Sequence, residues 1–147
     1  MMEKKEYRLE DSLGYKLFQA SRLMTNRLNR HFKENGFSLT HEQWQILSRL
    51  YEKDGQTQHA LAILNERDEP SVSRLIDNLI KRNLVERRAH PNDRRVNLIY
   101  LTEHGQQMKE SYTMLAEQTI AEASCGVDDK EFAICLKVLD QVRANLK

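Results

Sequence analysis

The fold of this chain is decided by residues 67–105, which read RDEPSVSRLIDNLIKRNLVERRAHPNDRRVNLIYLTEHG. Pro70 suits the first turn of a helix, and apolar residues then recur at three- and four-residue steps, as along one face of an α-helix. Residues 84–88 and 96–101 have the composition of strands, and the turn-forming residues of 89–95 separate them. The stretch therefore predicts a helix followed by a β-hairpin.

Helices are predicted on both sides of this stretch. Thr40 and Gln43 have the spacing of a capping box, in which two side chains satisfy free backbone N–H groups at a helix start. Apolar residues at helical spacing predict helices over 11–34, from Thr40 to Asp54, over about 57–65, from Thr102 to about Ser124, and from Asp128 to about Leu146. Leu61, Leu64 and Cys135 are expected in the core. The sequence thus predicts a mainly α fold with a small β-hairpin.

The terminal helices carry apolar stripes that nothing else in the chain is expected to cover. The central helices and the hairpin can share one small core, so the first helix and the last two need another partner. Their stripes include Leu13, Leu17 and Met24 near one end and Phe132, Leu136 and Leu139 near the other. Exposed apolar patches of that size are rare on monomers, and a second copy of the chain is the simplest cover. We therefore expect a homodimer.

The composition is that of an ordinary soluble protein, with 39% hydrophobic and 31% charged residues. No apolar run approaches the roughly 18 residues that span a bilayer, and residues 1–6 lack the apolar stretch of a signal peptide. The two cysteines, Cys125 and Cys135, match neither a disulfide framework nor a zinc pattern. These features predict a cytoplasmic protein with no membrane partner.

Nothing in the sequence points to an enzyme. The five histidines are scattered, and none has the spacing of a metal-binding pair. No glycine-rich phosphate loop and no nucleophile elbow is present. His41 and neighbouring acidic residues could converge on zinc, although isolated surface histidines are the commoner explanation. We expect no catalytic residue, no metal site and no cofactor.

The charge distribution favours a nucleic-acid partner, although the net charge is only +1. Residues 81–95 hold six lysines and arginines against two acidic residues, whereas residues 96–147 have an acidic excess. A basic segment beside a more acidic tail is typical of a localised nucleic-acid-binding surface.

The helix before the hairpin has an exposed face that suits a DNA groove. Ser71, Ser73 and Arg74 lie near its start, where short polar groups and an arginine can reach base edges in the major groove. Asn78 and Lys81 continue the same polar face. Taken alone, such a helix is more often explained by a solvated face than by DNA reading. The hairpin that follows it favours the DNA-reading interpretation.

The hairpin ends in Asp93, Arg94 and Arg95. An arginine on a narrow loop can enter the minor groove, where the potential is most negative, and a neighbouring aspartate can hold it in place. The side chains that we expect to meet phosphates are Lys81, Arg82, Arg88 and Arg94. A helix and a hairpin in this order predict two neighbouring contacts with DNA.

Together these stretches resemble the MarR family of bacterial regulators. The resemblance rests on residues 67–79, on LVER at 84–87, on DRR at 93–95 and on LTEHG at 101–105, each at the spacing that the family uses. It is dense over residues 40–105 and continues toward both ends in helical layout only.

The resemblance implies a winged helix-turn-helix protein that binds double-stranded DNA as a homodimer. It further implies a repressor that occupies a pseudo-palindromic operator and is released by a small-molecule effector, such as an aromatic carboxylate. Residues 37–105 would form the DNA-binding domain, and residues 1–36 with 106–147 the helical dimerisation region. The effector would bind where the two regions meet. Trp44 and Tyr51 are the only local indication of such a site, and both are more readily explained as core residues than as pocket walls.

The resemblance also assigns roles to single residues. Ser71, Ser73 and Arg74 match the positions that contact bases and phosphates, Arg95 matches the minor-groove arginine, and Asp93 matches its partner. The chain departs from the family at two places. Glu69 stands where many members carry lysine, which should weaken DNA affinity or narrow specificity. Residues 13–17 lack the cysteine of the thiol-based peroxide sensors. A metal- or thiol-responsive regulator of the same fold remains the alternative, and a helical interaction module without DNA binding is a second one.

Overall fold

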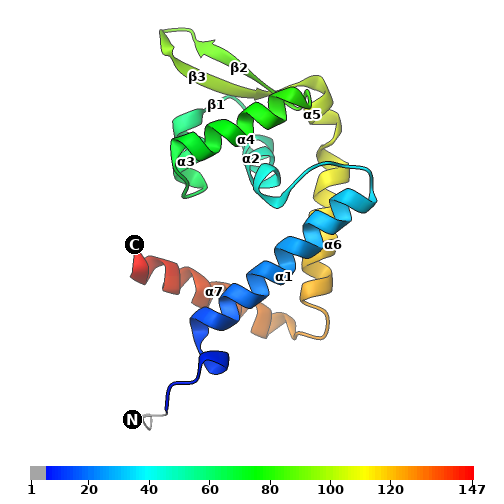
Figure 1. Ribbon diagram of the computed structural model, residues 1–147, viewed down its shortest axis with the longest axis vertical. Helices are drawn as coiled ribbons and strands as arrows, with labels where there is room; N and C mark the ends of the chain where they lie inside the picture. Colours follow the sequence, from blue (N-terminus) through cyan, green and yellow to red (C-terminus); the bar gives the residue numbers. More distant parts are fainter. Residues whose placement is uncertain (1–5) are drawn as a thin grey trace.

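The computed structural model describes residues 6–147, which form seven α-helices, a short 3-10 helix and three strands (Figure 1). Along the chain these are η1 (Leu9–Asp11), α1 (Leu13–Glu34), α2 (His41–Glu52), β1 (Gln56–Thr57), α3 (Gln58–Leu64), α4 (Glu69–Lys81), β2 (Val85–His90), β3 (Asp93–Leu101), α5 (Glu103–Gln107), α6 (Lys109–Ala123) and α7 (Asp129–Leu146). The expected lack of a signal peptide, and the start of the first dimerisation segment, fall largely on residues 1–5, which lie outside the described residues.

The centre of the chain is a winged helix. Helices α2, α3 and α4 pack beside an antiparallel sheet of strand order β1-β3-β2 (Figure 1). Val85 of β2 faces Leu101 of β3, and Gln56 of β1 faces Ile99 on the other side of β3. The fully buried side chains of this core are Ile46, Leu47, Leu50, Leu61, Val72, Ile76, Leu79, Val85 and Ile99. The predicted fold class, mainly α with a small β wing, is confirmed.

Side-chain caps fix where the central helices begin. At the start of α2 the Thr40 backbone N–H donates to Gln43 Oε1 at 3.1 Å, and the Gln43 N–H donates to Thr40 Oγ1 at 3.4 Å. This reciprocal pair is the predicted capping box. At α4, Asp68 Oδ1 accepts from the Ser71 N–H at 3.3 Å, and Pro70 lies in the first turn. These caps satisfy N–H groups that have no partner inside the helix.

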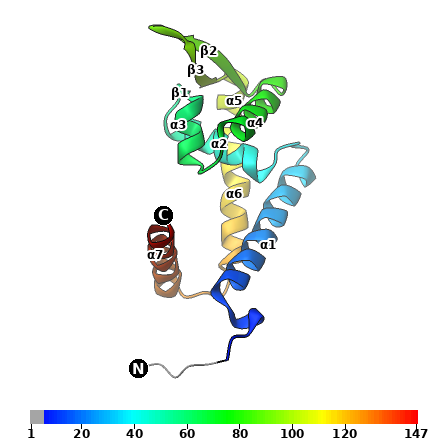
Figure 2. The same ribbon diagram turned by 60° about the vertical axis from the view of Figure 1, so that its left-hand side comes forward.

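Below the winged helix, α1 and α6 run side by side (Figures 1 and 2). The buried Phe32 ring of α1 meets the Tyr112 ring of α6 edge-on, with centroids 5.8 Å apart, and lies 6.4 Å from the Trp44 ring of α2. These aromatic contacts join the helical body to the winged helix. Helix α7 stands apart from the other helices and has no buried residue (Figure 2).

The structure differs from the predicted elements in three respects. The helix that Thr102 caps ends at Gln107, and α6 begins only at Lys109, so one long predicted helix is two. The hairpin strands are longer than predicted, because the turn consists of Pro91 and Asn92 alone. The third strand, β1, is absent from the prediction since two residues carry no periodic signal.

Two residues expected in the core are exposed. Leu64 is the last residue of α3 and is exposed, whereas Leu61, three residues earlier on the same helix, is fully buried. Cys135 lies on α7, whose apolar face meets no partner within the described chain. The same holds for the predicted terminal stripes, in which Leu13, Met24 and Leu136 are exposed.

Among residues 6–147, no helix combines the length and apolar character needed to cross a membrane.

Candidate nucleic-acid interface

One exposed face of α4 gathers the polar side chains expected to read DNA. Ser71, Arg74 and Asn78 follow one another at helical spacing. Arg74 Nη2 donates to Ser71 Oγ at 3.4 Å, and Asn78 Nδ2 donates to the Arg74 carbonyl at 3.2 Å. The side chains of Arg74 and Asn78 are exposed, and Lys81 extends the row at the end of the helix. The row offers donors and acceptors of the kind that base edges and phosphates engage.

Ser73 lies beside that row and differs from its residues in contacting the wing. It is half-buried, and its Oγ accepts from Arg87 Nη2 of β2 at 3.3 Å. The hydroxyl hydrogen of a serine in such a bond stays available to an acceptor. Ser73 therefore faces both the wing and the exposed side of α4.

The wing carries an oriented arginine on the first residues of β3. Arg95 Nε donates to Asp93 Oδ1 at 3.2 Å, and Arg95 Nη2 donates to Asp93 Oδ2 at 3.4 Å. The Arg95 backbone N–H also donates to Asp93 Oδ1 at 3.0 Å. The side-chain hydrogen bond from Arg95, followed by the backbone bond, lowers the pKa of the Asp93 carboxyl. The Arg95 side chain is 90% exposed, so this contact orients a guanidinium that otherwise faces solvent.

The other basic side chains of this region fall into two groups. Lys81 and Arg94 are exposed, and within residues 6–147 they make no ion pair. Arg88 Nε donates to Glu86 Oε1 at 2.7 Å, and its guanidinium lies 4.4 Å from the centre of the Tyr100 ring. Arg82 donates to the Ser38 carbonyl and, at 2.8 Å, to Gln43 Oε1, which is buried. The guanidinium of Arg82 thus points into the protein, contrary to the expectation that it meets a phosphate.

Two acidic residues at the start of α4 have partners within the protein. Asp68 caps the helix, and the hydrogen bond with Ser71 lowers the pKa of its carboxyl. Glu69 Oε1 lies 3.1 Å from His59 Nδ1 of α3. Asp68 is therefore explained by helix capping, whereas Glu69 adds a negative charge close to the predicted DNA-facing row.

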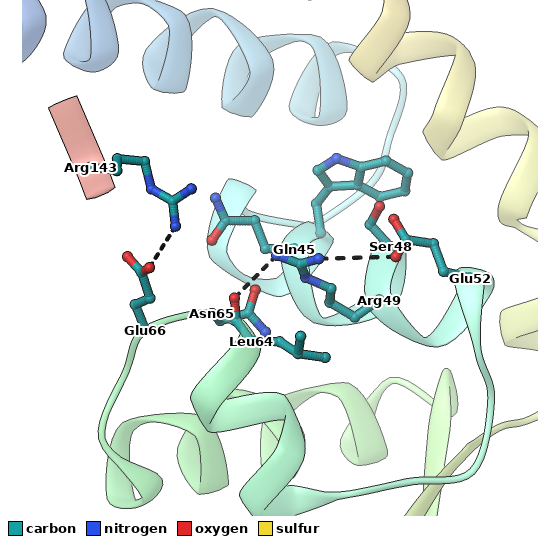
Figure 3. Close-up of a pocket in the computed structure, with 9 residues that line it drawn as sticks. Gln45, Ser48, Arg49, Glu52, Leu64, Asn65, Glu66 and Arg143 are labelled. Carbon is teal, nitrogen blue, oxygen red and sulfur yellow. Dashed lines mark hydrogen bonds and ion pairs between the residues drawn. The ribbon is translucent and has the colours of Figure 1, made fainter. Parts of the chain in front are cut away.

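A second candidate site is a pocket of about 420 Å³ between α2, the end of α3 and α7 (Figure 3). Trp44, Ser48 and Arg49 of α2 line it, and Arg49 Nη2 donates to the Leu64 carbonyl at 3.1 Å. Across the pocket, Glu66 Oε1 lies 2.5 Å from Arg143 Nη2 and 3.0 Å from Lys147 Nζ. Hydrogen bonds from Lys147 and then Arg143 lower the pKa of Glu66.

These ion pairs join the C-terminal end of α7 to the loop that precedes α4. Trp44 lines this pocket, but Tyr51, the other predicted aromatic, does not. The Tyr51 hydroxyl instead donates to the Gly105 carbonyl at 2.6 Å, and burial raises its pKa. The sequence pattern gives no signal for the Glu66 contacts, because their partners are 77 and 81 residues away along the chain.

No group of three or more histidine, cysteine or acidic side chains in residues 6–147 is arranged to hold a metal ion. Both cysteines are exposed and carry free thiols, which is contrary to the expectation for Cys135.

Comparison with known proteins points to the same part of the chain. Residues 39–96 match the model of the MarR family. The chain is 26% identical over 131 residues to the HTH-type transcriptional regulator MhqR of Bacillus subtilis, and the match covers 89% of both proteins.

Solved structures of similar proteins share the fold over almost the whole chain. A probable transcriptional regulator from Pseudomonas aeruginosa superposes with a TM-score of 0.84 at 27% identity, covering 92% of this chain and 99% of that one. A variant of MarR from Escherichia coli, solved in complex with operator DNA, superposes with a TM-score of 0.82 at 24% identity, covering 88% and 92% of the two chains. The likeness therefore extends beyond the winged helix to the terminal helices.

Proposed function

We propose that this chain is a transcription regulator of the MarR type that represses transcription by binding a pseudo-palindromic operator as a homodimer, since residues 39–96 match the model of that family. The observation that carries this proposal is the exposed Arg95, held by Asp93 on a wing that directly follows a helix with a polar, exposed face. The similarity to a regulator solved with operator DNA supports the same mode of binding.

In the proposed complex α4 enters the major groove and the wing enters the minor groove. Ser71, Ser73, Arg74 and Asn78 contact bases or nearby phosphates from α4. Lys81, Arg88 and Arg94 meet phosphates, which makes the affinity salt-dependent. Arg95 enters the minor groove, where the enhanced negative potential of a narrow groove attracts it. Asp93 lowers the conformational entropy that Arg95 loses on binding.

The proposed dimer forms through residues 1–36 and 106–147, while residues 37–105 form the DNA-binding domain. Helix α7 supports this arrangement because its apolar residues, Leu136 and Val138 among them, are exposed in the single chain. On α6, Met114 and Ile120 are also exposed. Burying such a set against a second copy removes apolar surface from water, at about 25 cal/mol per Å².

We further propose that a small anion, such as an aromatic carboxylate, releases the protein from DNA. The pocket in Figure 3 suits this chemistry, since it combines the Trp44 ring with the guanidinium groups of Arg49 and Arg143. A bound carboxylate would compete with Glu66 for Arg143, and the loop before α4 would lose that ion pair. The pocket lies between α7 and the winged helix.

We also propose that the protein acts in the cytoplasm.

A gel shift with the DNA upstream of its own gene tests the proposed function. We expect a shift that specific competitor DNA abolishes and scrambled DNA of equal length does not, with two chains bound per duplex. Aromatic carboxylates are then added, and release of the DNA is expected. Equal competition by scrambled DNA would contradict operator binding. Release by peroxide in the wild type but not in Cys125→Ser would instead favour the thiol-responsive alternative, and release by zinc the metal-responsive one.

A further inference from the structure

We propose that Arg87 is a positioning residue that fixes the wing relative to α4. It serves DNA recognition through its contacts with other side chains of the protein rather than through a phosphate contact. The inference rests on the DNA binding proposed above. From the sequence alone Arg87 is one more cation in the basic segment 81–95, so its role follows from its contacts.

The guanidinium of Arg87 joins three elements. Arg87 Nη1 donates to Asp77 Oδ1 of α4 at 2.6 Å. Arg87 Nη2 lies within donating distance of two oxygens of Ser73, its carbonyl at 3.3 Å and its Oγ at 3.3 Å. The same Nη2 also reaches Gln58 Oε1, on the first residue of α3, at 3.3 Å. Strand β2 is thereby bonded to both helices of the helix-turn-helix.

The place of Arg87 on its strand explains why it points inward. Successive side chains of a strand alternate between its faces, so Arg87 shares a face with Val85, which is buried. Arg88 is on the opposite face, where it pairs with Glu86. The Arg87 side chain is only 27% exposed, against 90% for Arg95. Both terminal nitrogens of Arg87 are thus directed toward protein oxygens, which leaves little of the guanidinium for a phosphate.

Arg87 lies at a point of the wing where a small rotation of the strands displaces the turn by a large distance. The turn at Pro91 begins four residues beyond Arg87, which is about 13 Å of extended strand at 3.3 Å per residue. A rotation of about 10° at Arg87 would therefore displace the turn by about 2 Å, several times the tolerance of a well-positioned binding group. Because α4 and the wing enter different grooves, they must keep a fixed relative orientation to bind together.

The variant Asp77→Asn separates a positioning role of Arg87 from a charge effect, because the two predict opposite changes in operator affinity. Removing a negative charge near DNA should tighten binding if charge alone matters. If Asp77 holds Arg87, Asp77→Asn should instead weaken operator binding, by at least about threefold for a coupling near the lower end of measured contact pairs. Glu69→Gln is the matched control, since it removes an exposed negative charge of α4 that does not touch Arg87, and it should bind at least as tightly as the wild type.

The salt dependence of binding supplies the second readout. A phosphate contact contributes about 0.9 to the slope of log affinity against log salt concentration, so Arg94→Gln should lower the slope by about that amount. Arg87→Gln should weaken operator binding by about tenfold or more while the slope stays that of the wild type. Thermal unfolding shows whether each variant is folded, and only the affinity of folded protein is compared.

Tighter binding by Asp77→Asn, or a slope lowered by about 0.9 in Arg87→Gln, would overturn the proposal and make Arg87 a phosphate contact. Wild-type affinity in both variants would also overturn it. These outcomes differ from a failure of the proposed function itself, in which the wild-type protein would show no preference for operator over scrambled DNA.

Discussion

Replacing Arg95 by alanine tests whether the wing reads DNA, because the side chain contacts Asp93 but, within residues 6–147, packs against no buried residue of the core. It is 90% exposed, and its Nε donates to Asp93 Oδ1 at 3.2 Å. Exposed substitutions away from buried features change stability by at most about 0.5 kcal/mol. For a domain of this size that corresponds to a shift in Tm of less than about 2 °C.

The expected effect on binding is much larger. Arg95→Ala removes a charge from the groove of most negative potential and also removes a preoriented guanidinium. We expect operator affinity to fall by at least tenfold, or about 1.4 kcal/mol. Asp93→Ala should weaken binding less, because the lost orientation of Arg95 is partly offset by the loss of a negative charge close to DNA.

The assay is a fluorescence titration of the three proteins against one operator at fixed salt, with thermal unfolding of the same samples. Unchanged Tm with a tenfold weaker titration is the result that the structure predicts for Arg95→Ala. Wild-type affinity in this variant would refute the reasoning, and the wing would then be an exposed hairpin without a role in binding. A large drop in Tm would equally show that Arg95 stabilises the fold in a way that its exposure does not suggest.

Three further predictions concern stability and assembly. Gly105→Ala should destabilise the fold by about 1–3 kcal/mol in thermal unfolding, because a Cβ there would lie 2.1 Å from the Leu84 carbonyl oxygen; Gln106→Ala, at an exposed neighbour, should not. Sedimentation at micromolar concentration should show a dimer, and Leu136→Asp should shift it toward monomer; a wild-type monomer would contradict the dimer. The hydrogen bond from His31, followed by the charges of His31 and Arg27, lowers the pKa of Glu122. The ionised Glu122 carboxylate therefore stabilises the fold at neutral pH, and this contribution is lost as the pH falls through its lowered pKa. Glu122→Gln should accordingly flatten the acid limb of a plot of unfolding free energy against pH.

Much of the fold follows from local sequence, and the reasons are physical. The capping box of Thr40 and Gln43 needs only residues three apart, and the apolar face of α4 only helical spacing. The sequence cannot place β1, because its pairing with β3 joins residues more than 40 positions apart. Nor does it predict the break at Met108, because the apolar stripe that indicates a helix begins only at that residue and says nothing about where the segment before it ends.

The candidate site shows the same division between local and distant contacts. The bond between Asp93 and Arg95 spans two residues, and the sequence predicts it correctly. The basic segment does not reveal which arginines face solvent, because Arg82 and Arg87 find their acceptors on other elements. Their role depends on which face of the wing or helix end meets a neighbour, and this is set by the packed fold.

The central claim, that this chain is a dimeric reader of a specific DNA sequence, is tested most directly by selecting bound DNA from a random pool. The account predicts one enriched motif with two-fold symmetry, its half-sites about one helical turn (roughly 10 bp) or a multiple of it apart, bound by two chains. Recovery of DNA without a common motif, at an affinity that salt alone controls, would contradict it.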